Sequence, residues 1–176
     1  MSDRFKSEDL IHALSRELHV RGLVVRMPPE VHDAGQGGFI PRLIQLYQQS
    51  GKVLYIDDGS ARWAAVHRSD TAVLLRLALE KAASCDSSRN GQTADVTYHA
   101  IAEQGIPMKN IAQMIGKHLK LPVESQSVQE AETSLGFPAT IIGAHNPVSS
   151  EKTKRKLGWS PSGIALLDDM EANYFS

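Results

Sequence analysis

A glycine-rich stretch, Gly35-Gln36-Gly37-Gly38, lies between two apolar segments and is the first candidate for chemistry. Dinucleotide-binding βαβ units place such a loop at a helix N-terminus, where it holds phosphate, with an acidic residue after the next strand; here Asp57 takes that place. In those units, however, the glycines turn the chain directly after the strand. Here residues 28–38 follow the strand, and Ile40 stands at the third glycine position. We therefore predict a loop that crosses the end of a sheet, and nucleotide binding through it is the least favoured alternative.

The sequence has seven histidines, and no two of them have the spacing of a zinc motif such as His-Glu-x-x-His. His12 and His19 fall in an expected helix and are interpreted as a solvated edge. His67 precedes Asp70, an expected helix cap, so it either faces a pocket or braces the turn. The single cysteine, Cys85, lies in a polar stretch and is predicted to be a loop residue, which excludes a disulfide scaffold. We predict no metal site.

Two further kinds of site are disfavoured. The sequence has no Gly-x-Ser-x-Gly nucleophile elbow. The basic run Lys152-Thr153-Lys154-Arg155-Lys156 is typical of nucleic-acid or anionic-lipid binding, but the net charge of the chain is −1. We therefore interpret the run as the solvated face of a short helix, and we predict no nucleic-acid and no membrane partner.

The composition places these residues in an ordinary globular domain. The 176 residues are 41% hydrophobic and 22% charged, enough for one domain with a substantial core. No apolar run reaches the roughly 18 residues of a membrane span. Residues 1–6 lack the apolar segment of a secretory signal, so we expect a cytoplasmic protein.

The elements that must position the candidate residues are mainly helices, with a few short strands between them. This mixture predicts an α/β or α+β fold. We expect residues 1–176 to form a single unit. The strands are expected at residues 23–27, 53–56 and 96–101, the first of them with the apolar character of a parallel sheet. Helices are expected to begin near Ser7, Phe39, Asp70, Pro107, Ser127, Ser150 and Pro161. In the first helix, one face carries Leu10, Ile11, Leu14 and Leu18.

Four segments, in this order, resemble the C-terminal part of one family, the extended short-chain dehydrogenases/reductases of the NAD-dependent epimerase/dehydratase group. The first resembles the family's sixth strand and its proline-containing loop, the second its Arg…Val-His-x-x-Asp-x-Ala segment, the third a helix of its substrate lobe, and the fourth its Leu-Gly-Trp-x-Pro signature. They are residues 23–32, 59–72, 111–116 and 156–161.

The resemblance implies an α/β fold that is the C-terminal portion of a Rossmann-like NAD(P)-binding fold: the last sheet strands plus a mostly helical substrate lobe. It implies NAD or NADP as cofactor and oxidoreductase-type chemistry on a small hydroxy, keto or sugar-like substrate. The matching positions imply cofactor contacts near the nicotinamide from Pro28, Pro29 and Val31, and a substrate pocket lined by Arg62, Trp63 and His67.

One departure from the family pattern limits this expectation. Family members carry a Gly-x-x-Gly-x-x-Gly loop and a Tyr-x-x-x-Lys pair, in which the tyrosine is the general acid/base and the lysine lowers its pKa. Here no tyrosine is followed by a lysine four positions on, and that loop is missing. The resemblance therefore implies no catalytic residue in these 176 residues, and a C-terminal fragment that is inactive alone and binds NAD(P) weakly.

A second hypothesis, from another class, is a non-catalytic interaction or sensor protein built on the same lobe. It would self-associate, or bind a partner, through the apolar face that a missing Rossmann half leaves exposed. Self-association favours this hypothesis, whereas a monomer in solution counts against it.

Overall fold

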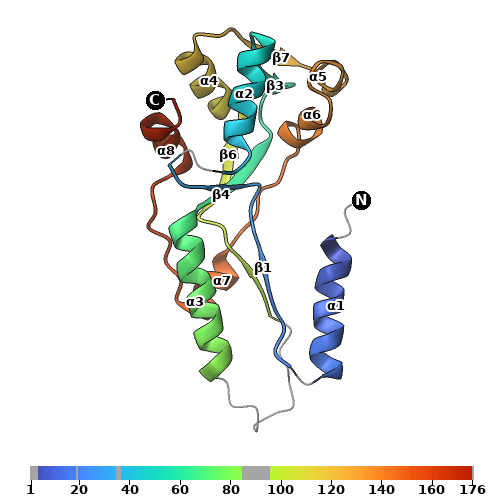
Figure 1. The fold of residues 1–176 in the computed structure, drawn as a ribbon, viewed down its shortest axis with the longest axis vertical. Coiled ribbons are helices and arrows are strands. Elements are labelled where there is room, and N and C mark those ends of the chain that lie inside the picture. The colour runs from blue at the N-terminus through green and yellow to red at the C-terminus, as the bar shows by residue number, and fades with distance from the viewer. Residues whose placement is uncertain (1–3, 19, 35–36, 85–95, 176) are drawn as a thin grey trace.

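The computed structural model describes residues 4–18, 20–34, 37–84 and 96–175 of the chain. Helices and strands are mixed along these residues (Figure 1). In chain order the elements are α1 (Arg4–Glu17), β1 (Leu23–Arg26), β2 (Glu30–His32), α2 (Ile40–Ser50), β3 (Val53–Ile56), β4 (Arg62–His67), α3 (Arg68–Ser84), β5 (Val96–His99), β6 (Glu103–Pro107), α4 (Met108–Leu119), β7 (Val123–Gln126), α5 (Val128–Leu135), α6 (Phe137–Ile142), α7 (Glu151–Leu157) and α8 (Leu166–Asn173).

The described strands form three small sheets, and most of their pairings are parallel. β1 pairs with β5 and β3 with β7, both in parallel. The third sheet has the order β2-β4-β6, in which β4 runs parallel to β2 and antiparallel to β6. The parallel pairing of β1 confirms the expectation drawn from its apolar sequence.

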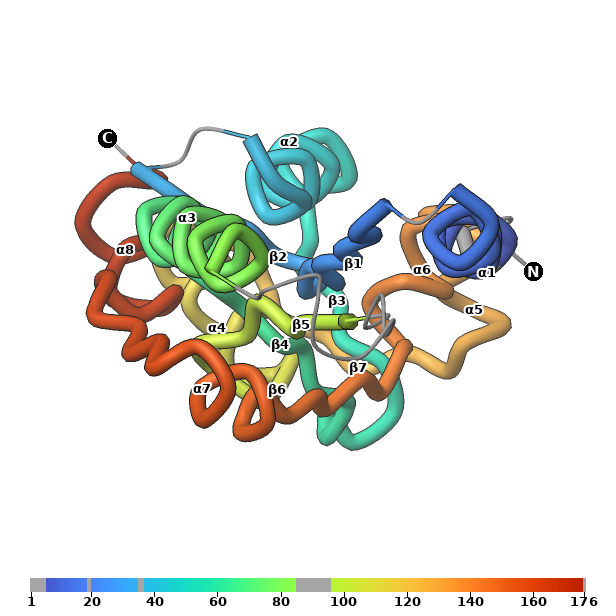
Figure 2. Tube along the Cα trace, turned by 90° about the horizontal axis from the view of Figure 1, so that it is seen from below, coloured from blue at the N-terminus to red at the C-terminus, as the bar shows by residue number. Residues whose placement is uncertain are grey.

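The helices are distributed over two regions. In the first, α1 and α3 flank the β1–β5 pair on its two sides, and α7 packs against β5 (Figure 2). In the second, at the end of the molecule drawn uppermost in Figure 1, α2, α4, α5 and α6 gather around β3 and β7. β4 connects the regions, because it contacts α3 of the first region and also α8, which packs against α4 of the second. The functional residues near β4 therefore lie where the two regions join.

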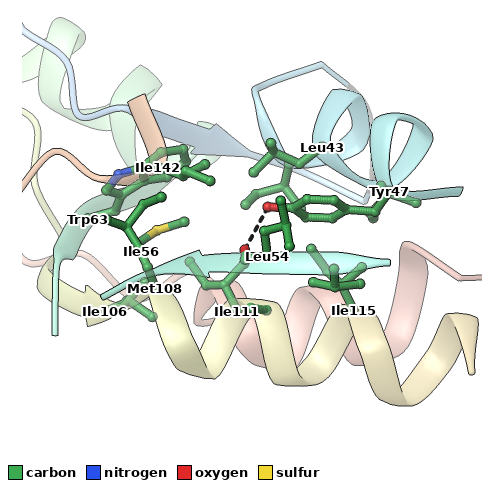
Figure 3. Packing of buried hydrophobic residues seen from close by; sticks show 14 of the residues in the cluster. Leu43, Tyr47, Leu54, Ile56, Trp63, Ile106, Met108, Ile111, Ile115 and Ile142 are labelled. Atoms are coloured by element: carbon green, nitrogen blue, oxygen red, sulfur yellow. Dashed lines mark hydrogen bonds between the residues drawn. The ribbon is translucent and has the colours of Figure 1, made fainter. Parts of the chain in front are cut away.

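The larger of two hydrophobic cores lies in the second region, between α2, β3 and α4 (Figure 3). Its one buried phenol, Tyr47, donates a 2.9 Å hydrogen bond to the carbonyl of Leu54, so the polar end of the ring is satisfied. The smaller core lies beneath α3 and includes Trp159, whose indole N–H donates to the carbonyl of Asp70 at 3.0 Å. Together the cores fix both ends of β4.

The ends of several helices have the residue types that favour them. Gly51 ends α2 in the left-handed conformation (φ 72°), and Gly158 does the same after α7 (φ 64°). α5 begins where the sequence predicts a helix, after Ser127, and Ser127 and Glu130 form a capping box in which each side chain accepts a backbone N–H of the other residue. These signals are local, so they do not depend on how the rest of the chain packs.

Other expectations are wrong. The described part of the chain has seven strands instead of three. β2, β6 and β7 are short or polar, whereas β4 (Arg-Trp-Ala-Ala-Val-His) is six residues long with four consecutive buried positions and was missed despite its apolar centre. α1 begins at Arg4, so Ser7 lies inside it. α3 begins at Arg68, so Asp70 is not its cap; its carboxylate instead accepts the backbone N–H groups of Ser162 (3.0 Å) and Gly163 (2.9 Å).

The apolar face predicted for the first helix is largely unburied. Leu10 and Leu18 are 56% and 63% exposed, and Ile11 and Leu14 are each more than a third exposed. None of the described helices is both long enough and apolar enough to cross a membrane. The interpretations of His19, Gly35, Gln36 and Cys85 fall outside the described residues.

Candidate functional site

The segment predicted to touch the cofactor connects β1 to β2. Pro28 is buried, while Pro29 and Val31 are half-buried and keep part of their surface accessible. β2 lies beside β4 in a register that sets Val31 opposite Val66 and His32 opposite His67. The pairing therefore brings a predicted cofactor residue next to His67, a predicted substrate residue.

The other two predicted substrate residues lie apart from His67. Arg62 is exposed at the opposite end of β4, where its guanidinium donates to the carbonyl of Gly105 at 3.0 Å. Trp63 is completely buried in the larger core, and its indole N–H donates to the carbonyl of Ile141 at 3.1 Å. The structure thus does not gather Arg62, Trp63 and His67 around one pocket, and substrate binding by each stays a prediction.

A buried histidine–carboxylate pair lies directly beside this junction. His32 Nδ1 is 2.8 Å from Oδ2 of Asp169 on α8, and the two side chains are 0% and 2% exposed. Asp169 also accepts the backbone N–H of Ala34 (3.2 Å) and the amide of Asn173 (2.8 Å) through Oδ1. Burial raises the pKa of Asp169, but the hydrogen bonds from His32 and Asn173 lower it below its ordinary value overall.

A histidine oriented by a carboxylate is the arrangement used by general bases. Here the other ring nitrogen of His32, Nε2, has no hydrogen-bond partner among the described residues, and the nearest carboxylate oxygen, Oε1 of Glu103, is 4.0 Å away. Both partners are shielded from solvent, so the pair attaches α8 to β2 rather than presenting a base to a substrate. Through His32 and Ala34 it fixes the chain directly after Val31.

His67 braces the start of α3, one of the two roles considered for it. Its Nδ1 accepts both the backbone N–H (3.3 Å) and the hydroxyl (2.7 Å) of Ser69. Because a backbone N–H only donates, Nδ1 is the acceptor and the proton of His67 is on Nε2, which faces Asp33 Oδ1 at 3.6 Å. Asp33 also forms an ion pair with Arg68. The ring of His67 meets that of His32 edge-on, with 5.3 Å between centroids.

Glu30 occupies the place where an anion would bind at the N-terminus of α2. Its Oε2 accepts the backbone N–H groups of Phe39 (2.8 Å) and Ile40 (3.3 Å), while Oε1 has no partner among the described residues. Gly38 lies against the same carboxyl at φ 79°, and a Cβ there would fall 2.2 Å from Oε1. A phosphate at this helix end would have to displace Glu30, which argues against the glycine-loop reading of Gly37 and Gly38.

The buried position of Glu30 makes stability depend on pH. Burial raises the pKa of this carboxyl to about 7, although the N–H groups of Phe39 and Ile40 oppose the shift. A folded-state pKa above the unfolded value means that stability is full below about pH 4.5 and is lost as pH rises to about 7, by about 3 kcal/mol in all. We expect Glu30→Gln, which keeps an acceptor for α2, to remove this part of the pH dependence in urea unfolding measured from pH 4 to 8.

Glu30→Ala serves as the matched control, because it removes both the charge and the cap. It should lower the free energy of unfolding by about 1–3 kcal/mol at pH 4, where the wild-type carboxyl is neutral and still accepts both N–H groups. A Glu30→Gln variant with the same dependence on pH as the wild type would show that Glu30 is not the group responsible.

Sequence reasoning missed most of the polar residues at this junction. Glu30 and His32 lie on either side of Val31 in β2, so both side chains point to the buried face of the strand. The available sequence signal was this alternation of side chains directly after the two prolines. Asp169 is 137 residues from His32, and only the packing of α8 brings them together. No cluster of three or more metal-ligating side chains occurs among the residues described.

Comparison with curated proteins finds relatives of undetermined role. No family model matches the chain. An uncharacterized protein of Saccharomyces cerevisiae is 45% identical over 155 residues, which cover 88% of this chain and 49% of that protein. An uncharacterized protein of Schizosaccharomyces pombe is 43% identical over 156 residues, covering 89% of this chain and 50% of that protein. The chain thus spans about half the length of the curated relatives it matches.

Comparison with solved structures identifies the fold. The dTDP-glucose 4,6-dehydratase DesIV from Streptomyces venezuelae, with NAD and TYD bound, matches with a TM-score of 0.65 at 15% identity, over 96% of this chain and 47% of that chain. UDP-glucuronic acid 4-epimerase from Bacillus cereus, in complex with UDP-glucuronic acid and NAD, matches with a TM-score of 0.64 at 14% identity, over 95% and 48%. A UDP-galactose 4-epimerase gives 0.64 at 17%, over 95% and 49%.

At these identities the likeness concerns the fold alone. It confirms the α/β class expected from the sequence, because the parallel pairs β1–β5, β2–β4 and β3–β7 and the helices around them match Rossmann-like neighbours over nearly the whole chain. The chain therefore has the α/β fold of Rossmann-like NAD(P)-binding proteins and corresponds to about half of each of these dehydratase and epimerase structures.

Proposed function

We propose that these residues form the C-terminal, substrate-binding half of an NAD(P)-dependent epimerase, dehydratase or reductase that acts on a small hydroxy, keto or sugar-like substrate. The observation that supports the proposal most is the match of nearly the whole chain to about half of a nucleotide-sugar dehydratase and of two epimerases. The fungal relatives, of which the chain also spans about half, are consistent with a longer functional unit.

The residues after β1 fit one end of a dinucleotide. Ligands of open α/β sheets bind beyond the carboxyl ends of the strands, and Pro28 and Pro29 follow the carboxyl end of β1 directly. Neither proline has an N–H donor, and the partly accessible Pro29 and Val31 offer an apolar surface suited to a flat nicotinamide ring, with the buried Pro28 beneath them as support. When bound, the cofactor would supply hydride acceptance and donation.

Among the residues described, we find no group free to bind the phosphates of a dinucleotide at the start of α2. The N-terminal N–H groups of α2 are occupied by Glu30, and no tyrosine of the sequence is followed by a lysine four positions on. We infer that the glycine-rich loop and the proton-transferring pair belong to a second half. This chain would orient the substrate and hold the nicotinamide end, with the His32–Asp169 pair fixing the segment that does so.

Titration with NADH tests the proposal. The purified chain should show no saturable binding below about 1 mM. A chimera that joins it to the part of the Saccharomyces cerevisiae relative outside the match, in the relative's own order, should bind at least about 100-fold more tightly. Micromolar binding by the chain alone, or no binding by a folded chimera, would overturn the proposal.

The exposed apolar row on α1 favours a second candidate, a non-catalytic interaction protein. Leu10, Ile11 and Leu14 lie on α1, Leu18 follows its end directly, and all four are more than a third exposed. If a second copy covers this row, sizing chromatography should show a dimer that Leu14→Lys dissociates. A monomer whose elution is unchanged by Leu14→Lys would exclude self-association through α1.

A further inference from the structure

A hollow of about 510 Å³ lies between β5 and the segment that leads into α7. Its polar lining residues include Thr97, His99, Ser149, Lys152, Thr153 and Arg155, and Pro147 and Val148 are the apolar ones. α7 packs along β5 in this part of the molecule (Figure 2). None of these residues belongs to the segment around Val31 or to β4, so the hollow is separate from the proposed cofactor and substrate site.

The hollow carries an excess of positive charge. Lys152 and Arg155 are exposed on its rim, and neither forms an ion pair with a described residue. The one acidic residue of the lining, Glu151, is paired with Lys154 at 3.3 Å. Two cations are therefore left without a counter-charge beside a single carboxylate that is already neutralised.

The floor of the hollow is held in place by hydrogen bonds. The backbone N–H of His99 donates to the hydroxyl of Thr153 at 2.8 Å, and Thr153 is 3% exposed. Ring atom Nδ1 of His99 is 3.2 Å from the carbonyl oxygen of Ser149, which only accepts, so Nδ1 carries a proton. The ring is thus held by the segment before α7.

We propose that this hollow binds a phosphorylated small molecule. A phosphate group accepts several charge-assisted hydrogen bonds at once, and Arg155 offers a planar fork of donors beside the ammonium of Lys152. Thr97 and the exposed Ser149 also line the hollow, and their hydroxyls can add neutral donors. The volume of about 510 Å³ exceeds that of a phosphate and leaves space for the organic group that carries it.

A solvated basic face, the interpretation favoured by the sequence alone, differs from this site in one measurable way. On a solvated face, every cation of α7 contributes equally to anion binding. In the hollow, Lys152 and Arg155 are the cations of α7 that line the cavity, so they alone should contribute. Lys156 lies on the same helix, is exposed and is outside the lining, so Lys156→Gln is a control with the same change of charge.

Calorimetric titration of the full chain with inorganic phosphate, pyrophosphate and ribose 5-phosphate tests the site. We expect saturable binding that is weakened about tenfold by Lys152→Gln and by Arg155→Gln, and is unchanged by Lys156→Gln. No saturation up to about 10 mM would overturn the proposal. An equal loss in Lys156→Gln would also overturn it, since it would indicate general attraction of anions to the helix.

A duplex DNA of random sequence provides the remaining comparison. The phosphorylated small molecules should bind at a salt concentration at which the duplex does not, because a bounded hollow does not admit a duplex. If the duplex binds more tightly than pyrophosphate, and all three glutamine variants weaken it alike, α7 is a basic surface and not a small-molecule site.

Discussion

Replacing Asp169 with alanine is expected to lower the free energy of unfolding by about 3–5 kcal/mol, because it leaves three hydrogen-bond donors at a buried site without their acceptor. The carboxylate serves three donors: the ring of His32, the backbone N–H of Ala34 and the amide of Asn173. It is 1% exposed, so water cannot take its place without opening the junction between β2 and α8. Urea unfolding at pH 7 measures the loss.

Two milder variants control for this result. Asp169→Asn keeps the shape of the side chain and one acceptor oxygen, so it should lower the free energy of unfolding less than Asp169→Ala does. Asn173→Ala removes one donor from an exposed residue and should cost no more than about 1 kcal/mol. If Asp169→Ala falls within that same range, the pair does not hold α8 to β2.

The lowered pKa of Asp169 predicts the direction in which stability changes with pH. Because that pKa lies below its ordinary value, the carboxylate stabilises the fold above about pH 4 and loses this effect as pH falls through the folded-state pKa. The difference in stability between the wild type and Asp169→Ala should therefore shrink in strong acid. Glu30 acts in the opposite direction, since its raised pKa favours the folded state at low pH.

Elements with a local signature could be predicted from the sequence. The apolar stretches of β1, β3 and β5 identify them as strands, and the Ser127–Glu130 capping box marks the start of α5. β7, with the sequence Val-Glu-Ser-Gln, has no such signature and is a strand only because it pairs with β3. β2 is three residues long and depends in the same way on β4.

The candidate site was only partly predictable for a related reason. Pro28, Pro29, Val31 and His67 belong to recognisable segments, and the pairing of β2 with β4 brings Val31 and His67 close together. Nothing in the order of the residues indicates that Asp169 would reach His32, since that contact depends on the packing of α8.

Replacing Trp63 with alanine is expected to lower the free energy of unfolding by about 3–5 kcal/mol through loss of apolar contacts and the cavity left behind. Trp63 is 0% exposed, lies near Ile142 in the larger core (Figure 3), and meets the ring of Phe39 with 5.4 Å between centroids. Its neighbour Arg62 is exposed on the same strand, so Arg62→Ala is the control and should change stability by less than about 1 kcal/mol.

Trp63→Phe keeps the prediction testable if the alanine variant does not fold. It retains an aromatic ring in the core but leaves the carbonyl of Ile141 without its indole donor, so we expect a loss of about 1–3 kcal/mol. A tryptophan that lined a substrate pocket would be partly solvated, and its truncation would affect ligand binding far more than stability. If both Trp63 variants lose less than about 1 kcal/mol of unfolding free energy, Trp63 lines a substrate pocket instead of the core. The expected larger losses would assign it to the core that supports β4.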